Sequence, residues 1–121
     1  MTTILIIDDS KLARSMVSNM VASLRPDWTV ETANNADEAL ARVADLTPDM
    51  AVIDYNMPGM DGLTLATVLR GRFPAMTISI LTANVQDSTR RKVANLGFGF
   101  IDKPITTDKL RDALAAMAIR P

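Results

Sequence analysis

The chain has 121 residues, of which 48% are hydrophobic, and 13 Lys and Arg residues against 14 Asp and Glu residues leave a formal net charge of −1. This length suffices for one core, and we expect a single domain over residues 1–121. The balance of charge gives no sign of a nucleic-acid interface, and the absence of Cys and His excludes thiolate nucleophiles, zinc sites built on these residues and phosphohistidine on this chain.

Five short segments rich in β-branched residues alternate with longer segments of helical period. The predicted strands are residues 3–8, 28–33, 50–54, 77–81 and 99–101. This alternation predicts a doubly wound α/β fold, in which a parallel sheet of five strands is covered by helices on both faces. Because no apolar run approaches the roughly 20 residues of a membrane span and no signal peptide is visible, we expect a cytoplasmic protein without membrane insertion.

Four of the longer segments carry apolar residues at intervals of three and four, which predicts helices that pack one face on the sheet. Their apolar positions are Ala13, Met16, Val17, Met20, Val21 and Leu24, then Ala36, Ala39, Leu40 and Val43, then Leu65, Ala66 and Leu69, and finally Leu110, Ala113, Leu114 and Met117. Ser10 is the expected N-cap of the first of these helices. The segment before the fifth strand differs, because residues 86–92 are polar almost throughout and only Val85, Val93 and Leu96 offer an apolar face. We expect that helix to be the most weakly anchored.

Acidic residues stand at the ends of two of these strands, with Asp8 and Asp9 at the first and Asp54 at the third. In known open sheets of strand order 2-1-3-4-5, which we expect here, ligands bind at the carboxyl ends of strands 1 and 3, where the order reverses. Carboxylates that share one crevice stay ionised together only beside a cation. Oxygen ligands suit Mg²⁺, so the pattern predicts a magnesium site. The plainer alternative is that Asp9 caps the first helix and Asp8 is a solvated strand end.

Polar residues also end the two remaining strands of the expected site, with Thr82 after the fourth and Lys103 just beyond the fifth. A carboxylate that becomes an acyl phosphate gains charge and acceptor oxygens, for which a hydroxyl, a cationic side chain and a metal are suitable partners. Either residue alone would be an ordinary loop residue. Together with the acidic cluster they indicate a phosphoryl-binding site.

Four segments along nearly the whole chain resemble the receiver domain of response regulators in two-component signalling. They are residues 6–10 (IIDDS), 52–62 (VIDYNMPGMDG), 81–83 (LTA) and 97–104 (GFGFIDKP). Their order and spacing make the resemblance specific. It implies a flavodoxin-like fold and a signalling switch, not an enzyme.

The resemblance implies that Asp54 is the phosphoacceptor, which takes a phosphoryl group from the phosphohistidine of a sensor histidine kinase or a phosphotransfer protein. It implies that Mg²⁺ is held by Asp8, Asp9, Asp54 and the backbone carbonyl of Asn56. The side chain of Asn56 would also flank the path of an attacking water and tune the lifetime of the phosphoryl group.

Further residues receive roles from the same resemblance. Thr82 would move toward the phosphoryl group, Ala83 would leave room beside it, and Lys103 would pair with its oxygens. Phe100 would be the aromatic switch, at a position where many members of the family have Tyr. Asn84 would tune dephosphorylation together with Asn56.

Output is expected on the surface of the fourth helix, fifth strand and fifth helix, which would bind a target protein after phosphorylation shifts a pre-existing equilibrium. The chain ends directly after the fifth predicted helix with no output domain, which favours a stand-alone messenger of the chemotaxis type. A phosphate sink and the excised receiver of a larger protein remain open alternatives.

Two functions of other classes are less well supported by the residues. An aspartyl-phosphate hydrolase typically carries a second acid two residues after its nucleophile, where this chain has Asn56. A flavodoxin-like cofactor binder would need a phosphate-cradling loop after the first strand, where this chain has Asp8, Asp9 and Ser10.

Overall fold

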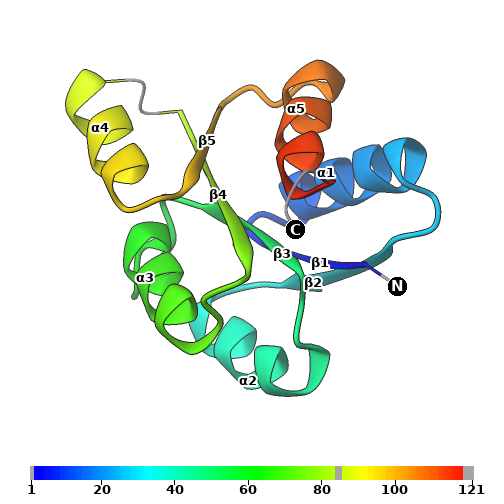
Figure 1. The fold of residues 1–121 in the computed structure, drawn as a ribbon, viewed down its shortest axis with the longest axis horizontal. Coiled ribbons are helices and arrows are strands. Elements are labelled where there is room, and N and C mark those ends of the chain that lie inside the picture. Colours follow the sequence, from blue (N-terminus) through cyan, green and yellow to red (C-terminus); the bar gives the residue numbers. More distant parts are fainter. Residues whose placement is uncertain (1, 84–85, 119–121) are drawn as a thin grey trace.

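A computed structural model describes residues 2–83 and 86–118, which form five strands alternating with five helices (Figure 1). The strands are β1 (Thr3–Ile7), β2 (Thr29–Ala33), β3 (Met50–Asp54), β4 (Thr77–Thr82) and β5 (Gly99–Asp102). The helices are α1 (Lys11–Leu24), α2 (Ala36–Leu46), α3 (Gly62–Arg72), α4 (Asp87–Asn95) and α5 (Thr107–Ala118). The strands lie in the order β2-β1-β3-β4-β5 and every neighbouring pair is parallel. The predicted doubly wound sheet of order 2-1-3-4-5 is confirmed.

The helices cover both faces of the sheet, with α1 and α5 on one face and α2, α3 and α4 on the other (Figure 1). Successive side chains of a strand point to opposite faces. Ile4 and Ile6 of β1 therefore pack with α1 and α5, whereas Leu5 and Ile7 pack with α2 and α3. The central strand β3 is buried throughout, as expected of a parallel strand with helices on both sides.

The register of the strands brings the predicted site residues to one edge of the sheet. Ile7, the last residue of β1, pairs with Ile53, so Asp8 and Asp54 both directly follow the same pair of the ladder. On the other side of β4, the N–H of Lys103 donates to the main-chain carbonyl of Thr82 at 2.9 Å. Residues far apart in the sequence thus meet at the carboxyl ends of the strands.

Side-chain caps fix where the helices next to this edge begin. The Ser10 hydroxyl accepts a hydrogen bond from the N–H of Ala13 at 3.2 Å, which confirms the predicted N-cap of α1. Asn35 and Asp61 cap α2 and α3 in the same way. Because Ser10 is the cap of α1, the carboxylate of Asp9 is left exposed and available to the acidic cluster.

In α4, Thr89 and Val93 are buried and the other seven residues are exposed, so the prediction of a polar, weakly anchored helix fits the structure. Leu96 was expected on its apolar face, and this is wrong: its side chain is 44% exposed. The reason is that α4 ends at Asn95 and the chain turns away at Gly97, whose φ is 83°. The predicted contact of Val85 lies outside the described residues.

A second core prediction is wrong in α1. Met16 was expected on the buried stripe, but its side chain is 45% exposed, whereas Val17 and Val21 are fully buried as predicted. Met16 lies at the border of the stripe, where it lines an open groove between α1 and the loop after β5 that includes Ile105. Helical period alone did not distinguish the border of the stripe from its centre.

Candidate functional site

Three carboxylates form a cluster at the carboxyl ends of β1 and β3. Asp8, Asp9 and Asp54 each offer an oxygen, and these oxygens lie within 4.8 Å of one another. Asp8 and Asp54 are only 2% and 4% exposed, whereas Asp9 is exposed. Negative charges so close together and largely removed from water repel one another unless a positive partner is present. The structure thus brings together the three acids that the sequence analysis singled out.

Asp8 shows how the cluster is held. Its N–H donates to the carbonyl of Ala33 at 3.2 Å, its own carbonyl accepts from Arg14 Nη1 at 2.7 Å, and its Oδ1 accepts from the N–H of Ser10 at 2.9 Å. The remaining oxygen, Oδ2, is buried and has no hydrogen-bond partner among the described residues. A buried acceptor without a partner costs about 1–3 kcal/mol. Asp8 Oδ2 is therefore the atom of this cluster that most needs a ligand.

The donor set fits a magnesium ion. Burial raises the pKa of the Asp8 carboxyl above its ordinary value, and the nearby charges of Asp54 and Asp9 add to this rise, while the Ser10 N–H opposes it. A divalent cation would favour the ionised form and would satisfy the free Oδ2. Carboxylate oxygens with room for further oxygen ligands are the surroundings that Mg²⁺ prefers.

Asp54 also has a fixed cationic partner. Lys103 Nζ lies 2.9 Å from Asp54 Oδ1, and the two side chains are 34% and 5% exposed. Thr82, which ends β4, is fully buried beside the same strand ends. The peptide bond between Lys103 and Pro104 is cis. The buried carboxylate of Asp54 thus lies close both to the carboxylate oxygens of Asp8 and Asp9 and to an ammonium group.

The loop after β3 returns close to Asp54. A Cβ atom on Gly62 would lie 2.1 Å from the main-chain oxygen of Asp54, so only glycine fits at this first position of α3. The N–H of Gly62 donates to the carbonyl of Tyr55 at 2.9 Å, which closes the loop. Asn56 is exposed within it. From the sequence, Gly62 is visible only as the last residue of the segment 52–62 and has no assigned role there.

The remaining predicted residues lie around the cluster or beyond it. Ala83 lines the groove that also contains Met16 and Lys103. Phe100 is half-buried on β5 and packs against the core on the face of the sheet that α2, α3 and α4 cover. The guanidinium of Arg90 lies over its ring, 4.6 Å from the ring centroid. Asn84 lies outside the described residues.

The contact between Arg90 and Phe100, like the hydrogen bond from Arg14 to Asp8, was not predicted from the sequence. Both arginines are single long side chains on helices, and neither contact produces a periodic pattern. Only the spacing of Arg14 from the acidic pair, six residues after Asp8 and early in α1, gave a weak signal.

Comparison with known sequences identifies relatives over most of the chain. The response regulator receiver domain matches residues 4–115. The chain is 32% identical over 112 residues to the positive alginate biosynthesis regulatory protein of Pseudomonas aeruginosa, covering 92% of this chain and 45% of that protein. It is 33% identical over 100 residues to a protein-glutamate methylesterase/protein-glutamine glutaminase of Syntrophomonas wolfei, covering 82% of this chain and 28% of that protein. The chain thus spans less than half the length of these two relatives.

Solved structures agree with the sequence comparison. The chemotaxis protein CheY4 of Vibrio cholerae has a TM-score of 0.87 and 28% identity, covering 97% of this chain and 98% of that one. No helix among residues 2–83 and 86–118 is long and apolar enough to cross a membrane. The matching segment, the strand order and the acidic cluster lead to one conclusion. The chain belongs to the receiver domain family of two-component response regulators.

Proposed function

We propose that this receiver domain accepts a phosphoryl group on Asp54 from the phosphohistidine of a kinase or phosphotransfer protein, in a reaction that depends on Mg²⁺. The observation that carries the proposal is the position of Asp54, which is buried, lies beside two other acids and is paired with Lys103 at 2.9 Å. Receiver domains act as signalling switches that interact with such phosphodonors and with downstream targets.

In the proposed step, a carboxylate oxygen of Asp54 forms a bond to phosphorus while the P–N bond of the phosphohistidine breaks. The bonding electron pair leaves with the imidazole nitrogen, which takes up a proton from solvent. Lys103 is already paired with Asp54 and would follow the new negative charge onto the phosphoryl oxygens. The hydroxyl of Thr82 would donate to the same oxygens after a movement of the end of β4, with Ala83 leaving space.

Receiver domains generally bind Mg²⁺ in an acidic pocket, and here Asp8, Asp9 and Asp54 would hold it, together with the main-chain carbonyl of Asn56. When bound, the ion would neutralise the charge that gathers on the phosphoryl oxygens. The free Oδ2 of Asp8 supports this assignment, because that atom has no protein partner among the described residues.

The rim of the site offers a contact for the protein that carries the phosphohistidine. Leu12 and Met16 of α1 are 71% and 45% exposed. Met16 lines the open groove that also contains Lys103, Pro104 and Ile105, next to Asp54. A donor side chain can reach Asp54 only if its protein covers this rim, so exposed apolar side chains there support docking of the phosphodonor on α1.

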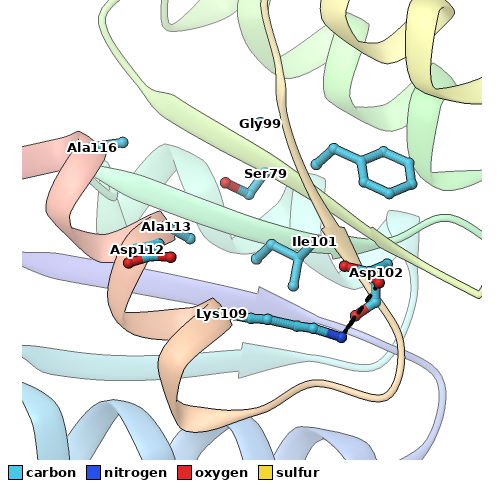
Figure 2. A pocket seen from close by; sticks show the side chains of 9 residues that line it. Ser79, Gly99, Ile101, Asp102, Lys109, Asp112, Ala113 and Ala116 are labelled. Carbon is cyan, nitrogen blue, oxygen red and sulfur yellow. Dashed lines mark hydrogen bonds and ion pairs between the residues drawn. The ribbon is translucent and has the colours of Figure 1, made fainter.

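For output we propose the surface of α4, β5 and α5. Arg90 of α4 lies over the ring of Phe100 on β5, which connects the polar helix to the proposed aromatic switch. Between β5 and α5 lies an open pocket of about 280 Å³, shown in Figure 2, where Lys109 reaches Asp102 at 3.3 Å. A weakly anchored helix beside an open edge of the sheet is a surface that a small change of charge can rearrange.

The same chemistry would serve a chemotaxis-type messenger, a phosphate sink or the receiver of a larger protein, and the proposal covers the receiver reaction common to all three. Exposed Asn56, two residues after Asp54, would tune how long the phosphoryl group persists.

The proposal is tested with phosphoramidate, a small phosphodonor that contains the same P–N bond. The chain is incubated with this donor and Mg²⁺, and incorporation of one phosphoryl group is measured by intact-mass spectrometry. We expect incorporation in the natural chain and its complete loss in Asp54→Asn, because the amide lacks the nucleophilic carboxylate.

The matched control is Asp61→Asn, in the loop that joins β3 to α3. Asn caps a helix about as well as Asp, so this variant keeps the start of α3 while removing a nearby carboxylate. It should be labelled like the natural chain. Undiminished labelling of Asp54→Asn would place the phosphoacceptor elsewhere and would refute the assignment.

A further inference from the structure

We propose that Arg14 is a positioning residue that fixes the main chain of the acidic pair, so that Asp8 Oδ2 stays aimed at the cation site. The inference rests on the proposed magnesium site. Arg14 Nη1 donates to the carbonyl of Asp8 at 2.7 Å and to Oδ1 of Asn34 at 3.0 Å. It thereby connects the turn after β1 to the loop after β2.

The hydrogen bonds of Asp8 explain why this contact matters for a ligand atom that Arg14 does not touch. The N–H of Asp8 is bound to Ala33, its Oδ1 to the N–H of Ser10, and its carbonyl to Arg14. Only Oδ2 is left without a partner among the described residues, and it is buried. Because the N–H, the Oδ1 and the carbonyl of Asp8 are held by hydrogen bonds, the direction of Oδ2 is fixed as well. Loss of the bond from Arg14 would free the peptide group between Asp8 and Asp9.

Arg14 is itself held in place by the second of its two bonds. Asn34, which accepts from Arg14, uses its own N–H to donate to Glu38 Oε2 at 3.3 Å in the first turn of α2. Both acceptors of Arg14 are neutral oxygens. Arg14 therefore orients the main chain of Asp8 through hydrogen bonds and does not act as a salt-bridge partner in these two contacts. A guanidinium presents several donors in a rigid plane and can bridge two segments in this way. Groups that orient metal ligands from outside typically affect metal affinity by about 10–100-fold.

The test is calorimetric titration of Mg²⁺ into the whole chain and three variants. Arg14→Met keeps the aliphatic stem and removes every donor, and we expect the Kd for Mg²⁺ to rise about 10-fold. Asn34→Ala leaves the bond to Asp8 but loosens Arg14, and we expect a rise of about 3-fold, below the loss for Arg14 itself. Arg70→Met is the matched control, because Arg70 also donates to a main-chain carbonyl, that of Pro74 at 2.9 Å, away from the site. Its Kd should equal that of the natural chain.

The outcomes separate this inference from the proposed function. If the natural chain binds Mg²⁺ and Arg14→Met has the same Kd, the positioning role is refuted and the proposed magnesium site is supported. Failure of the natural chain to bind Mg²⁺ overturns both. Thermal unfolding of each variant is recorded to identify any loss of fold. If Arg14→Met does not fold, Asn34→Ala decides, and an unchanged Kd in that variant contradicts the inference.

Discussion

Asp8 combines burial, a supporting hydrogen bond from Ser10 and an oxygen without a partner in the described chain. When no metal is bound, burial and the oxygen without a partner disfavour the ionised carboxylate, whereas the hydrogen bond from Ser10 favours it. Burial and the neighbouring carboxylates raise the pKa of Asp8, so ionisation of this side chain in the folded, metal-free protein costs free energy. The same arrangement becomes favourable once a cation is present.

This gives a prediction for stability against pH. An acid whose pKa is raised in the folded state binds more protons there than in the unfolded chain, where the pKa is about 3.9. Stability of the metal-free protein should therefore fall as pH rises from that value through the raised pKa of Asp8, and the lost stability is not regained above it. In Asp8→Asn this fall should be absent, and at neutral pH the variant should be more stable than the natural chain by about 1 kcal/mol. Urea unfolding at several pH values measures both.

Addition of Mg²⁺ supplies the control for the same variant. Saturating Mg²⁺ should stabilise the natural chain by mass action and should stabilise Asp8→Asn much less. A metal-free Asp8→Asn that is less stable than the natural chain at neutral pH would contradict this account of Asp8.

The position of Asp8, Asp9, Asp54, Thr82 and Lys103 at one edge of the sheet could be predicted from the sequence, because the carboxyl ends of parallel strands meet there and polar residues stand out against apolar strands. Apart from the N-cap of α1 at Ser10, the contacts that the main chain makes or receives around this site could not be predicted. The bond from the Ser10 N–H to Asp8, for example, depends on the geometry of one turn and not on residue type.

At the level of elements, the start of α3 is set by the contact of Gly62 with the end of β3. Any side chain at Gly62 would collide with the main chain of Asp54, whereas Gly71 near the other end of the same helix has open space around its Cα atom. The same helix thus contains one glycine, Gly62, that leaves no room for a side chain and another, Gly71, that does.

We predict opposite effects for the two alanine substitutions. Gly62→Ala should destabilise the protein by about 2–3 kcal/mol, because the main chain cannot yield as a flexible side chain would. It should also weaken Mg²⁺ binding by displacing Asp54. Gly71→Ala, the control within the same helix, should stabilise the protein by about 0.5–1 kcal/mol through the lower backbone entropy of the unfolded chain. Chemical denaturation measures both, and equal effects of the two substitutions would refute the close contact.

The anchoring of α4 gives a second prediction at this scale. α4 buries only Thr89 and Val93, whereas α3 buries Leu63, Leu65 and Leu69 among others. Hydrogen exchange followed by mass spectrometry should therefore show faster exchange of main-chain amides in α4 than in α3. Protection of α4 equal to that of α3 would contradict the weak anchoring of α4.

Strand positions could be predicted to within one residue, because β1, β3, β4 and β5 are largely apolar runs that end at or just before a polar residue, and β2 is a short segment rich in β-branched residues. Helix faces were harder to predict. Leu96 and Met16 fit the apolar period, yet one lies past the end of α4 and the other borders a groove, so both are exposed. Where a helix ends, and how far it overlaps the sheet, depend on tertiary packing that period does not encode.

For the molecule as a whole, the sheet connects the proposed site to the proposed output surface. Lys103 pairs with Asp54 and directly follows β5, while Phe100 on β5 lies under Arg90 of α4. A phosphoryl group on Asp54 would change the partner of Lys103 and, through β5, the surroundings of Phe100 and α4. These contacts identify β5 and α4 as the elements that should respond to a phosphoryl group on Asp54.

The central claim is that a change at Asp54 alters the surface of α4, β5 and α5, and NMR of the isotope-labelled chain with Mg²⁺ and beryllofluoride, a mimic of the phosphoryl group, tests it most directly. We predict changes in chemical shift around Asp8, Asp54 and Lys103 that continue through α4, β5 and α5. These changes should be absent in Asp54→Asn. An unchanged spectrum, or changes confined to α1 and α2, would contradict the account.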